Sequence, residues 1–112
     1  MISDRGTFSL GHLLRLKDGT LVMTYIKRQD VENGKLRSFA RGCEAVISRD
    51  HGVTWDLGRR YVLDEFEFSD GKPAWGTFCG HLYSTLLADG SILTAYSNYP
   101  AKGAVLIRWK VK

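Results

Sequence analysis

Two stretches of the sequence repeat one strand–turn–strand pattern, and this repetition restricts the fold more than any other feature. Residues 18–25 (DGTLVMTY) read against residues 89–96 (DGSILTAY), and the second copy begins 71 residues after the first. In the first copy Leu21, Met23 and Tyr25 lie at every second position, and residues 105–111 alternate in the same way, a period typical of strands and not of helices. Each Asp-Gly pair fits the two-residue turn of a hairpin, where residues that tolerate positive φ are needed. The repetition predicts an array of similar β units.

The rest of the chain also favours strands. Its 12 glycines and 2 prolines punctuate short alternating segments. Residues 38–47 have some helical spacing, but Gly42 interrupts it, and Val46 and Ile47 are β-branched. Long connections fall at 29–42 and 65–80, and loops of that length in a β domain are often functional. The expected strands are 10–17, 20–28, 43–49, 59–64, 81–88, 91–98 and 103–111.

The number of strands in each copy suggests the architecture. Four strands precede the second copy, and a repeated four-stranded antiparallel unit is the signature of a β-propeller blade. The 112 residues suffice for one small domain. We therefore predict an all-β fold, a partial β-propeller of about two blades. One blade would span 10–64, a linker loop 65–80, and a last, incomplete blade 81–111.

Composition excludes several classes of protein. Aromatic residues make up 12% of the chain, whereas disordered chains are poor in aromatics. No run approaches the ~18 apolar residues of a membrane span, so no membrane partner is expected. Residues 1–6 lack the apolar core of a secretory signal, and the compartment stays unknown. The net charge of +4 is not gathered into one patch, so no nucleic-acid partner is expected.

The cysteines and acidic residues do not predict a metal. Cys43 and Cys79 lack the spacing of metal ligands and have no third partner. They either form one disulfide or are both reduced and partly buried. No loop is dense enough in oxygen ligands to predict calcium. We expect no metal and no cofactor.

Residues 48–55 (SRDHGVTW) form the most specific motif, with the pattern S-x-D-x-G-x-T-W. Its carboxylate can accept backbone N–H bonds within the turn, and its glycine can supply positive φ. Its tryptophan can fold over the turn and bury its ring. The motif resembles the Asp-box of the bacterial neuraminidase (BNR) repeat. The structural residues of this Asp-box are Ser48, Asp50, Gly52, Thr54 and Trp55.

The neighbouring segments extend this resemblance to the sialidase superfamily. Residues 12–25 resemble the opening of a sialidase blade, and residues 45–48 resemble its third strand. Residues 83–93 and 107–109 resemble the start and the closing strand of the last blade. The resemblance covers nearly the whole chain but only the last third of a family member. It implies the C-terminal two blades of a six-bladed ring, completed by missing blades or by self-association.

The same resemblance implies a function. The parent would be a glycoside hydrolase acting on a glycan or glycoside substrate, and the isolated fragment would be inactive. One alternative is a non-catalytic propeller that binds carbohydrate or protein. Another is an independent small β domain whose open sheet edges are paired in a dimer.

The family nucleophile is a tyrosine, served by a glutamate base, an aspartate and three arginines. Tyr83 matches that tyrosine in its strand, although His81 occupies the place where the family residue usually lies. The two residues share strand parity, so both would face the same side. Two departures from the family pattern are Ser97 after Tyr96, where a glutamate is common, and Glu44 near the expected arginine.

Propeller topology predicts where a site would lie. The Asp-Gly turns and the Asp-box turn would share one rim, and the resemblance places the active site on the other. Gly11-His12-Leu13 and Gly80-His81-Leu82 would occupy matching positions. Tyr83 and His81 are the catalytic candidates, and His12, Arg28, Arg41, Trp75 and Asn98 are the substrate-binding candidates. Arg37, Glu67 and Asp70 lie on the same expected rim.

Each candidate also has a structural interpretation. Tyr83 would then be a half-buried aromatic, and the histidines would cap strand ends. The arginines would be solvated loop charges, and the acidic residues a solvated loop. Trp75 would either stack on a sugar face or pack between blades.

Overall fold

The computed structural model describes residues 2–3, 6–27, 30–38, 40–67, 79–98 and 103–112. Within these ranges the chain is all-β, as predicted, with no helix. No helix long and apolar enough to cross a membrane is present among the described residues. The strands are β1 (Ile2–Ser3), β2 (Gly6–Arg15), β3 (Leu21–Lys27), β4 (Asp30–Glu32), β5 (Lys35–Ser38), β6 (Ala40–Ser48), β7 (Tyr61–Glu67), β8 (Cys79–Leu86), β9 (Ile92–Asn98) and β10 (Gly103–Trp109).

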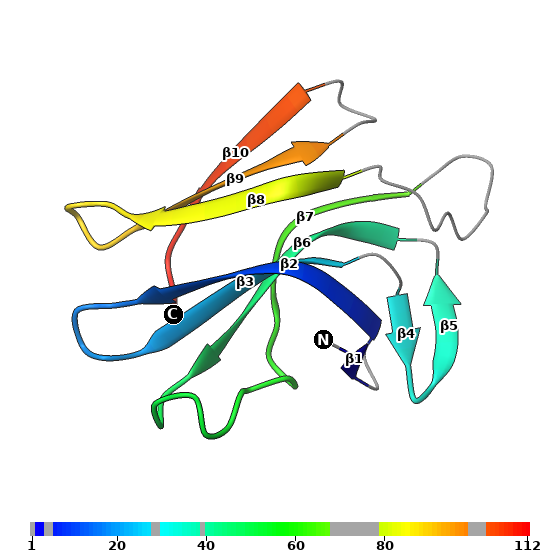
Figure 1. Cartoon of the computed structure of the whole chain (residues 1–112), viewed down its shortest axis with the longest axis horizontal. Coiled ribbons are helices and arrows are strands. Elements are labelled where there is room, and N and C mark those ends of the chain that lie inside the picture. Colours follow the sequence, from blue (N-terminus) through cyan, green and yellow to red (C-terminus); the bar gives the residue numbers. More distant parts are fainter. Residues whose placement is uncertain (1, 4–5, 28–29, 39, 68–78, 99–102) are drawn as a thin grey trace.

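The strands form two antiparallel sheets and a separate hairpin (Figure 1). The first sheet has the order β1-β2-β3-β6-β7, in which β1 adds only two residues. The second sheet has the order β10-β9-β8, and β4 pairs with β5 alone. The sequence order within each sheet is that of a simple meander, apart from the β4–β5 insertion between β3 and β6.

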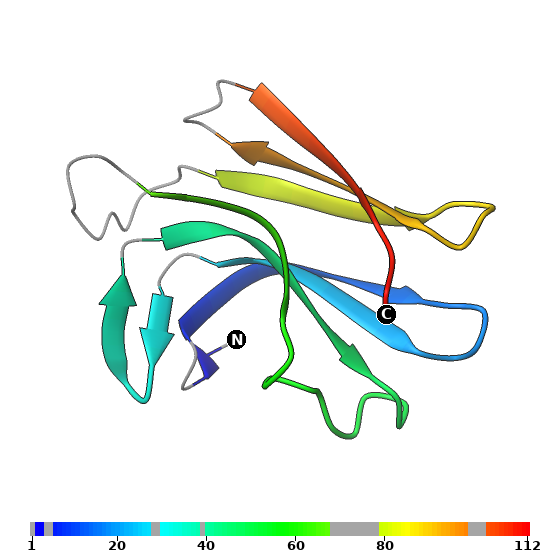
Figure 2. The ribbon, with the colours of Figure 1, turned by 180° about the vertical axis from the view of Figure 1, so that it is seen from behind.

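The core lies between the facing sides of the two sheets. The reverse view shows the same stacking of one sheet on the other (Figure 2). Val22, Ala45 and Ile47 from the first sheet pack with Ile92 from the second, and all four are buried. Fully burying a Val or Ile side chain stabilises a fold by about 1.5–3 kcal/mol, so this layer holds the sheets together. The first strands of the sheets, β2 and β8, lie against each other, and β7 contacts β10.

The two Asp-Gly turns have the same geometry. Leu16 N donates to Thr20 O at 2.8 Å and Leu87 N donates to Ser91 O at 2.8 Å. The aspartate in each turn accepts from the backbone N–H two residues later, at 2.9 Å. Hydrogen bonds lower the pKa of both carboxyl groups, chiefly the bond from the Thr20 backbone N–H for Asp18 and the bond from the Ser91 hydroxyl for Asp89.

The predicted two-residue form of these turns was wrong. Only the glycines have positive φ, 91° at Gly19 and 87° at Gly90, and neither aspartate does. Gly19 N donates to Leu16 O at 3.0 Å, which makes a three-residue loop with glycine in the left-handed position. The aspartate carboxylate binds its own downstream N–H and thereby favours this form.

The connection predicted at 29–42 is also different, because it contains the β4–β5 hairpin and the start of β6. The hairpin turns at Asn33 and Gly34, whose φ values are 54° and 74°. Asn-Gly is itself a strong hairpin signal, and it was overlooked because the flanking strands are short and polar. The 65–80 connection is shorter than predicted, since β7 continues to Glu67 and β8 begins at Cys79.

The connections between the strands lie at two opposite ends of the molecule. The β2–β3 and β8–β9 turns lie at one end, and the β4–β5 hairpin lies at the other (Figure 1). In the first sheet, the insertion between β3 and β6 therefore lies at the end opposite the β2–β3 turn.

Candidate functional site

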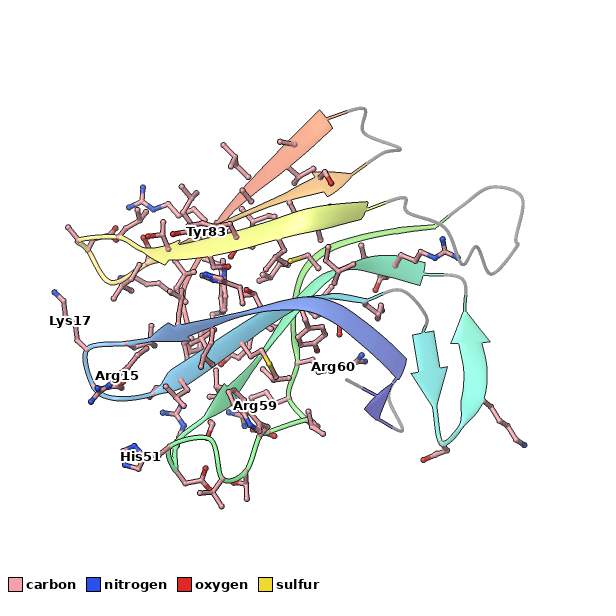
Figure 3. All side chains as sticks on the ribbon, in the orientation of Figure 1. Arg15, Lys17, His51, Arg59, Arg60 and Tyr83 are labelled. Carbon is pink, nitrogen blue, oxygen red and sulfur yellow. The ribbon has the colours of Figure 1, made fainter. Side chains whose placement is uncertain are left out.

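Tyr83 lies in the middle of β8, and its side chain is 63% exposed (Figure 3). Its ring contacts the imidazole of His12 from β2, with ring centroids 4.7 Å apart and planes tilted by 37°. The half-buried aromatic expected from a structural role does not describe this side chain. The two sheets thus bring one catalytic candidate and one substrate-binding candidate into contact.

Matching register shifts precede these two residues. In β2 the pairing moves from Ser9↔Ile26 to His12↔Thr24, and in β8 it moves from Gly80↔Ser97 to Tyr83↔Ala95. Each shift leaves one extra residue in the first strand of its sheet, which is the geometry of a β-bulge. The two bulges occupy equivalent places in the two sheets.

This register corrects the predicted match between the histidines. His12 is equivalent to Tyr83, not to His81, because His12 pairs with Thr24 and Tyr83 pairs with Ala95, the equivalent residue 71 positions later. The shared parity expected for His81 and Tyr83 assumed regular alternation, which the bulge interrupts. The backbone of His81 lies in β8, and its side chain falls outside the described set.

A row of hydrogen bonds links the sheets beneath Tyr83. Ser84 Oγ lies 2.8 Å from Thr24 Oγ1 across the sheet interface and 2.9 Å from Thr94 Oγ1 within its own sheet. Trp109 Nε1 donates to Thr94 Oγ1 at 2.9 Å, and Thr24 Oγ1 donates to His12 O at 3.3 Å. Thr24, Ser84 and Thr94 are buried, so water does not compete for these bonds.

The donors and acceptors at the ends of this row determine its direction. An indole N–H can only donate and a carbonyl can only accept. Thr24 donates its one hydroxyl proton to His12 O, so Thr24 must accept from Ser84. Ser84 donates its own proton to Thr24 and therefore accepts from Thr94. Each group in the row therefore donates to the next, in the direction from Trp109 to the His12 carbonyl, and in such a row each bond polarises the next.

Ser84 also holds the His12 side chain. Its backbone N donates to His12 Nδ1 at 3.3 Å. His12 is therefore held through both its carbonyl and its ring, and the site is built on the interface between the sheets.

Arg41 lies in β6, not in a loop, and is only 3% exposed. The prediction of a solvated loop charge was wrong, because β6 begins at Ala40 and draws this residue into the sheet. The remaining candidates are placed less fully. Asn98 closes β9, where its Cα pairs with Cys79, and its side chain is outside the described set. The same holds for the side chains of Arg37 and Glu67, whereas Arg28, Asp70 and Trp75 lie outside the described residues.

The predicted Asp-box residues form a closed hydrogen-bonded turn between β6 and β7. Asp50 Oδ1 accepts from Thr54 N at 2.9 Å and from Ser48 Oγ at 2.8 Å, and Ser48 Oγ accepts from Gly52 N at 2.8 Å. Thr54 Oγ1 donates to the other carboxylate oxygen. These bonds, led by that of the Thr54 hydroxyl, lower the pKa of Asp50 to about 2.

The backbone of this turn has positive φ at two successive residues, 60° at His51 and 87° at Gly52. Val53 N donates to Asp50 O at 3.3 Å, which closes a type I′ turn. Trp55 is half-buried and packs with Tyr25 and Val46 on the face of the first sheet that points away from the second. The turn is thus tied into the sheet by its tryptophan and plays a structural role.

Sequence reasoning missed a buried charged cluster on that same face. Glu44 accepts from Tyr25 OH at 3.0 Å and pairs with Lys27 Nζ at 3.2 Å and Arg60 NH1 at 3.2 Å. The side chains of Lys27 and Glu44 are each 1% exposed. Burial raises the pKa of Tyr25 well above its usual range, so its phenol stays protonated and donates. The signal available was the placement of Tyr25, Lys27 and Glu44 at alternate positions of two strongly apolar strands.

Two buried tyrosines occupy equivalent places opposite the bulges, and each binds a carboxylate. Tyr25 donates to Glu44, and Tyr96 donates to Asp64 of the other sheet. Among the described side chains, no carboxylate is hydrogen-bonded to Tyr83. The two tyrosines that bind carboxylates are therefore buried, and the exposed Tyr83 contacts an imidazole.

The described residues do not contain a cluster of three or more His, Cys, Asp or Glu side chains able to hold a metal ion. Cys43 is buried in the core between the sheets. The chain matches no protein-family model and has no significant match among curated proteins or solved structures. A functional assignment therefore depends on the residues themselves.

Proposed function

We propose that this chain is part of a sialidase-like β-propeller that acts on glycans, as a glycoside hydrolase in its full-length form. The observation that carries the proposal is the exposed Tyr83 on the first strand of a repeated β unit whose companion unit carries the Asp-box turn. Tyrosine is the nucleophile expected for an acidic sugar, because a carboxylate nucleophile would be repelled by the carboxylate of the sugar. Sialidases are one of the known exceptions to the rule of two catalytic carboxylates.

The arrangement of the sheets supports the propeller. Two units with equivalent bulges and identical Asp-Gly turns stack face to face, with their first strands side by side. The outer face of the second sheet carries a row of registered residues, Tyr83, Ala95 and Leu106, with Leu106 67% exposed. A further blade, or a second copy of the chain, would cover this row as the first sheet covers the inner face.

A non-catalytic propeller that binds carbohydrate or protein is the second candidate, and one observation favours it. His12, the equivalent of Tyr83 in the first sheet, contacts the neighbouring sheet. By repetition, Tyr83 would lie at a junction with the next blade. A residue at that junction contributes to binding or packing, and its hydroxyl would not be needed for turnover.

The test compares turnover and binding in the full-length protein, with sialosides and other glycosides as substrates. Tyr83→Phe keeps the ring and removes the hydroxyl, so the hydrolase predicts lost turnover with retained binding. Tyr61→Phe is the matched control, because Tyr61 donates only a 3.3 Å hydrogen bond to Lys112 O at an exposed edge. Glycan binding without turnover in the wild type would support the second candidate, and a folded protein with neither property would refute the hydrolase and the carbohydrate-binding propeller.

A further inference from the structure

The most constrained side chain beside Tyr83 is His12, and it is held from the opposite sheet. Ser84 N donates to His12 Nδ1 at 3.3 Å. We propose that His12 is a positioning residue for Tyr83, held as a neutral imidazole with its proton on Nε2, and that a second proton on Nδ1 releases Ser84 and frees the tyrosine. This inference rests on the proposed function only for its effect on a glycan ligand.

The tautomer follows from the chemistry of the contact. A backbone N–H cannot accept a hydrogen bond, so Nδ1 must offer its lone pair to Ser84. The neutral imidazole then carries its proton on Nε2. In this form His12 retains one donor and no free acceptor, so what it can offer a ligand is a hydrogen bond to an oxygen atom, such as a sugar hydroxyl or carboxylate.

The position of Ser84 is itself determined by the hydroxyl row described above. Its hydroxyl lies between Thr24 at 2.8 Å and Thr94 at 2.9 Å, both buried. The row of hydrogen bonds ends at the His12 carbonyl, which accepts from Thr24. The backbone of Ser84 therefore approaches His12 from a site that two buried hydroxyl groups hold in place.

Tyr83 depends on this imidazole because it has little other support. Its side chain is 63% exposed, and its ring contact within the described structure is with His12 at 4.7 Å. Tyr83 also directly precedes Ser84, the residue that holds the ring of His12. Orientation of the imidazole and orientation of the phenol are therefore coupled through two neighbouring residues of β8.

Protonation of Nδ1 would break this coupling. The imidazolium has two N–H donors, and one of them would face the N–H of Ser84. On β8 the titratable group that faces His12 is Tyr83, and on β3 the residue that faces it is Thr24, which does not titrate. The charged Lys27 and Glu44 lie on the other face of the first sheet, with Tyr25. No described carboxylate on these strands is placed to stabilise the imidazolium.

Nitrogen NMR of the histidine rings tests the proposal without a glycan. At neutral pH we expect the His12 spectrum to show an unprotonated Nδ1 and a protonated Nε2. On acidification, the Ser84 amide and Tyr83 ring signals should shift in step with the titration of His12. His51 is the internal control, because it is exposed in the 48–55 turn and its titration should leave Tyr83 unchanged.

Two variants of His12 test its hydrogen-bond acceptor and its ring contact separately. His12→Asn keeps an acceptor at the δ position but does not titrate, so the Ser84 amide signal should become independent of pH. His12→Phe keeps the ring contact and removes the acceptor, so that signal should shift at every pH. If His12→Phe fails to fold, the wild-type titration decides alone.

A His12 ring protonated on Nδ1 at neutral pH, or Tyr83 signals that do not follow its titration, would overturn the proposal. A confirmed tautomer with coupled signals, in a full-length protein that neither binds nor cleaves a glycan, would leave the positioning role intact and refute the proposed function. If glycan binding is present, we expect it to weaken as His12 takes up its second proton.

Discussion

The buried carboxylate of Glu44 should be far more important to stability than its half-exposed neighbour Glu65, although both contact Lys27. Glu44 lies 3.2 Å from Lys27 Nζ with both side chains 1% exposed, and it also accepts from Tyr25 and Arg60. Glu44→Gln keeps the size of the side chain and removes its charge. Breaking a buried ion pair by removing one partner costs about 3–5 kcal/mol. Whole domains have stabilities of about 5–15 kcal/mol, so this loss is a large fraction.

Glu65→Gln is the matched control. Glu65 lies 3.4 Å from the same Lys27 Nζ, but its side chain is 49% exposed. Solvent-exposed ion pairs contribute about 0–1 kcal/mol, so this variant should unfold almost like the wild type. Urea unfolding followed by tryptophan fluorescence measures both free energies of unfolding. Equal losses in the two variants would refute the reasoning, because burial would then not govern the strength of the pair.

Two further predictions concern the backbone and the acid stability of the chain. Gly42→Ala should prevent β6 from pairing with β7, because Gly42 has a φ of 150° and an added Cβ would lie 2.0 Å from Asp64 O. Gly58→Ala is the control, because the atom nearest to its added Cβ would lie 3.8 Å away. Circular dichroism should show that only the control folds normally. The pKa of Asp50 is lowered from 3.8 to about 2, so its contribution to stability is complete above about pH 4 and is lost as the pH falls toward 2. Asp50→Asn should be less stable at neutral pH and should lose less between pH 4 and 2 in denaturant titrations, and an unchanged acid transition would contradict this role.

Some predictions from sequence succeeded because they depended on neighbours along the chain. The alternation of residues 20–28 and 91–98 located β3 and β9 to within a residue or two. The Asp50 turn forms from partners at most four residues away, so its bonds could be read from spacing alone. The Asn33-Gly34 hairpin had an equally local signal and could have been found.

Other features depended on register, which no local pattern reports. The repeated Gly-His-Leu triplet suggested that His12 matches His81, but the paired strands keep the 71-residue offset of the longer repeat, which makes His12 equivalent to Tyr83. A bulge adds one residue to one strand only, so its position depends on the partner strand. Placement of Arg41 failed for a related reason, since the extent of β6 depends on its pairing with β7.

The sequence by itself determined the all-β class, the positions of β3 and β9 and the hydrogen bonds of the Asp50 turn, because these follow from alternation and from contacts within a few residues. Only the tertiary structure decided that Tyr83 meets His12, that Ser84 joins Thr24 to Thr94, and that Lys27 and Glu44 are buried together. These contacts join residues from different strands or different sheets. Their geometry depends on how two sheets stack and on what that stacking removes from water.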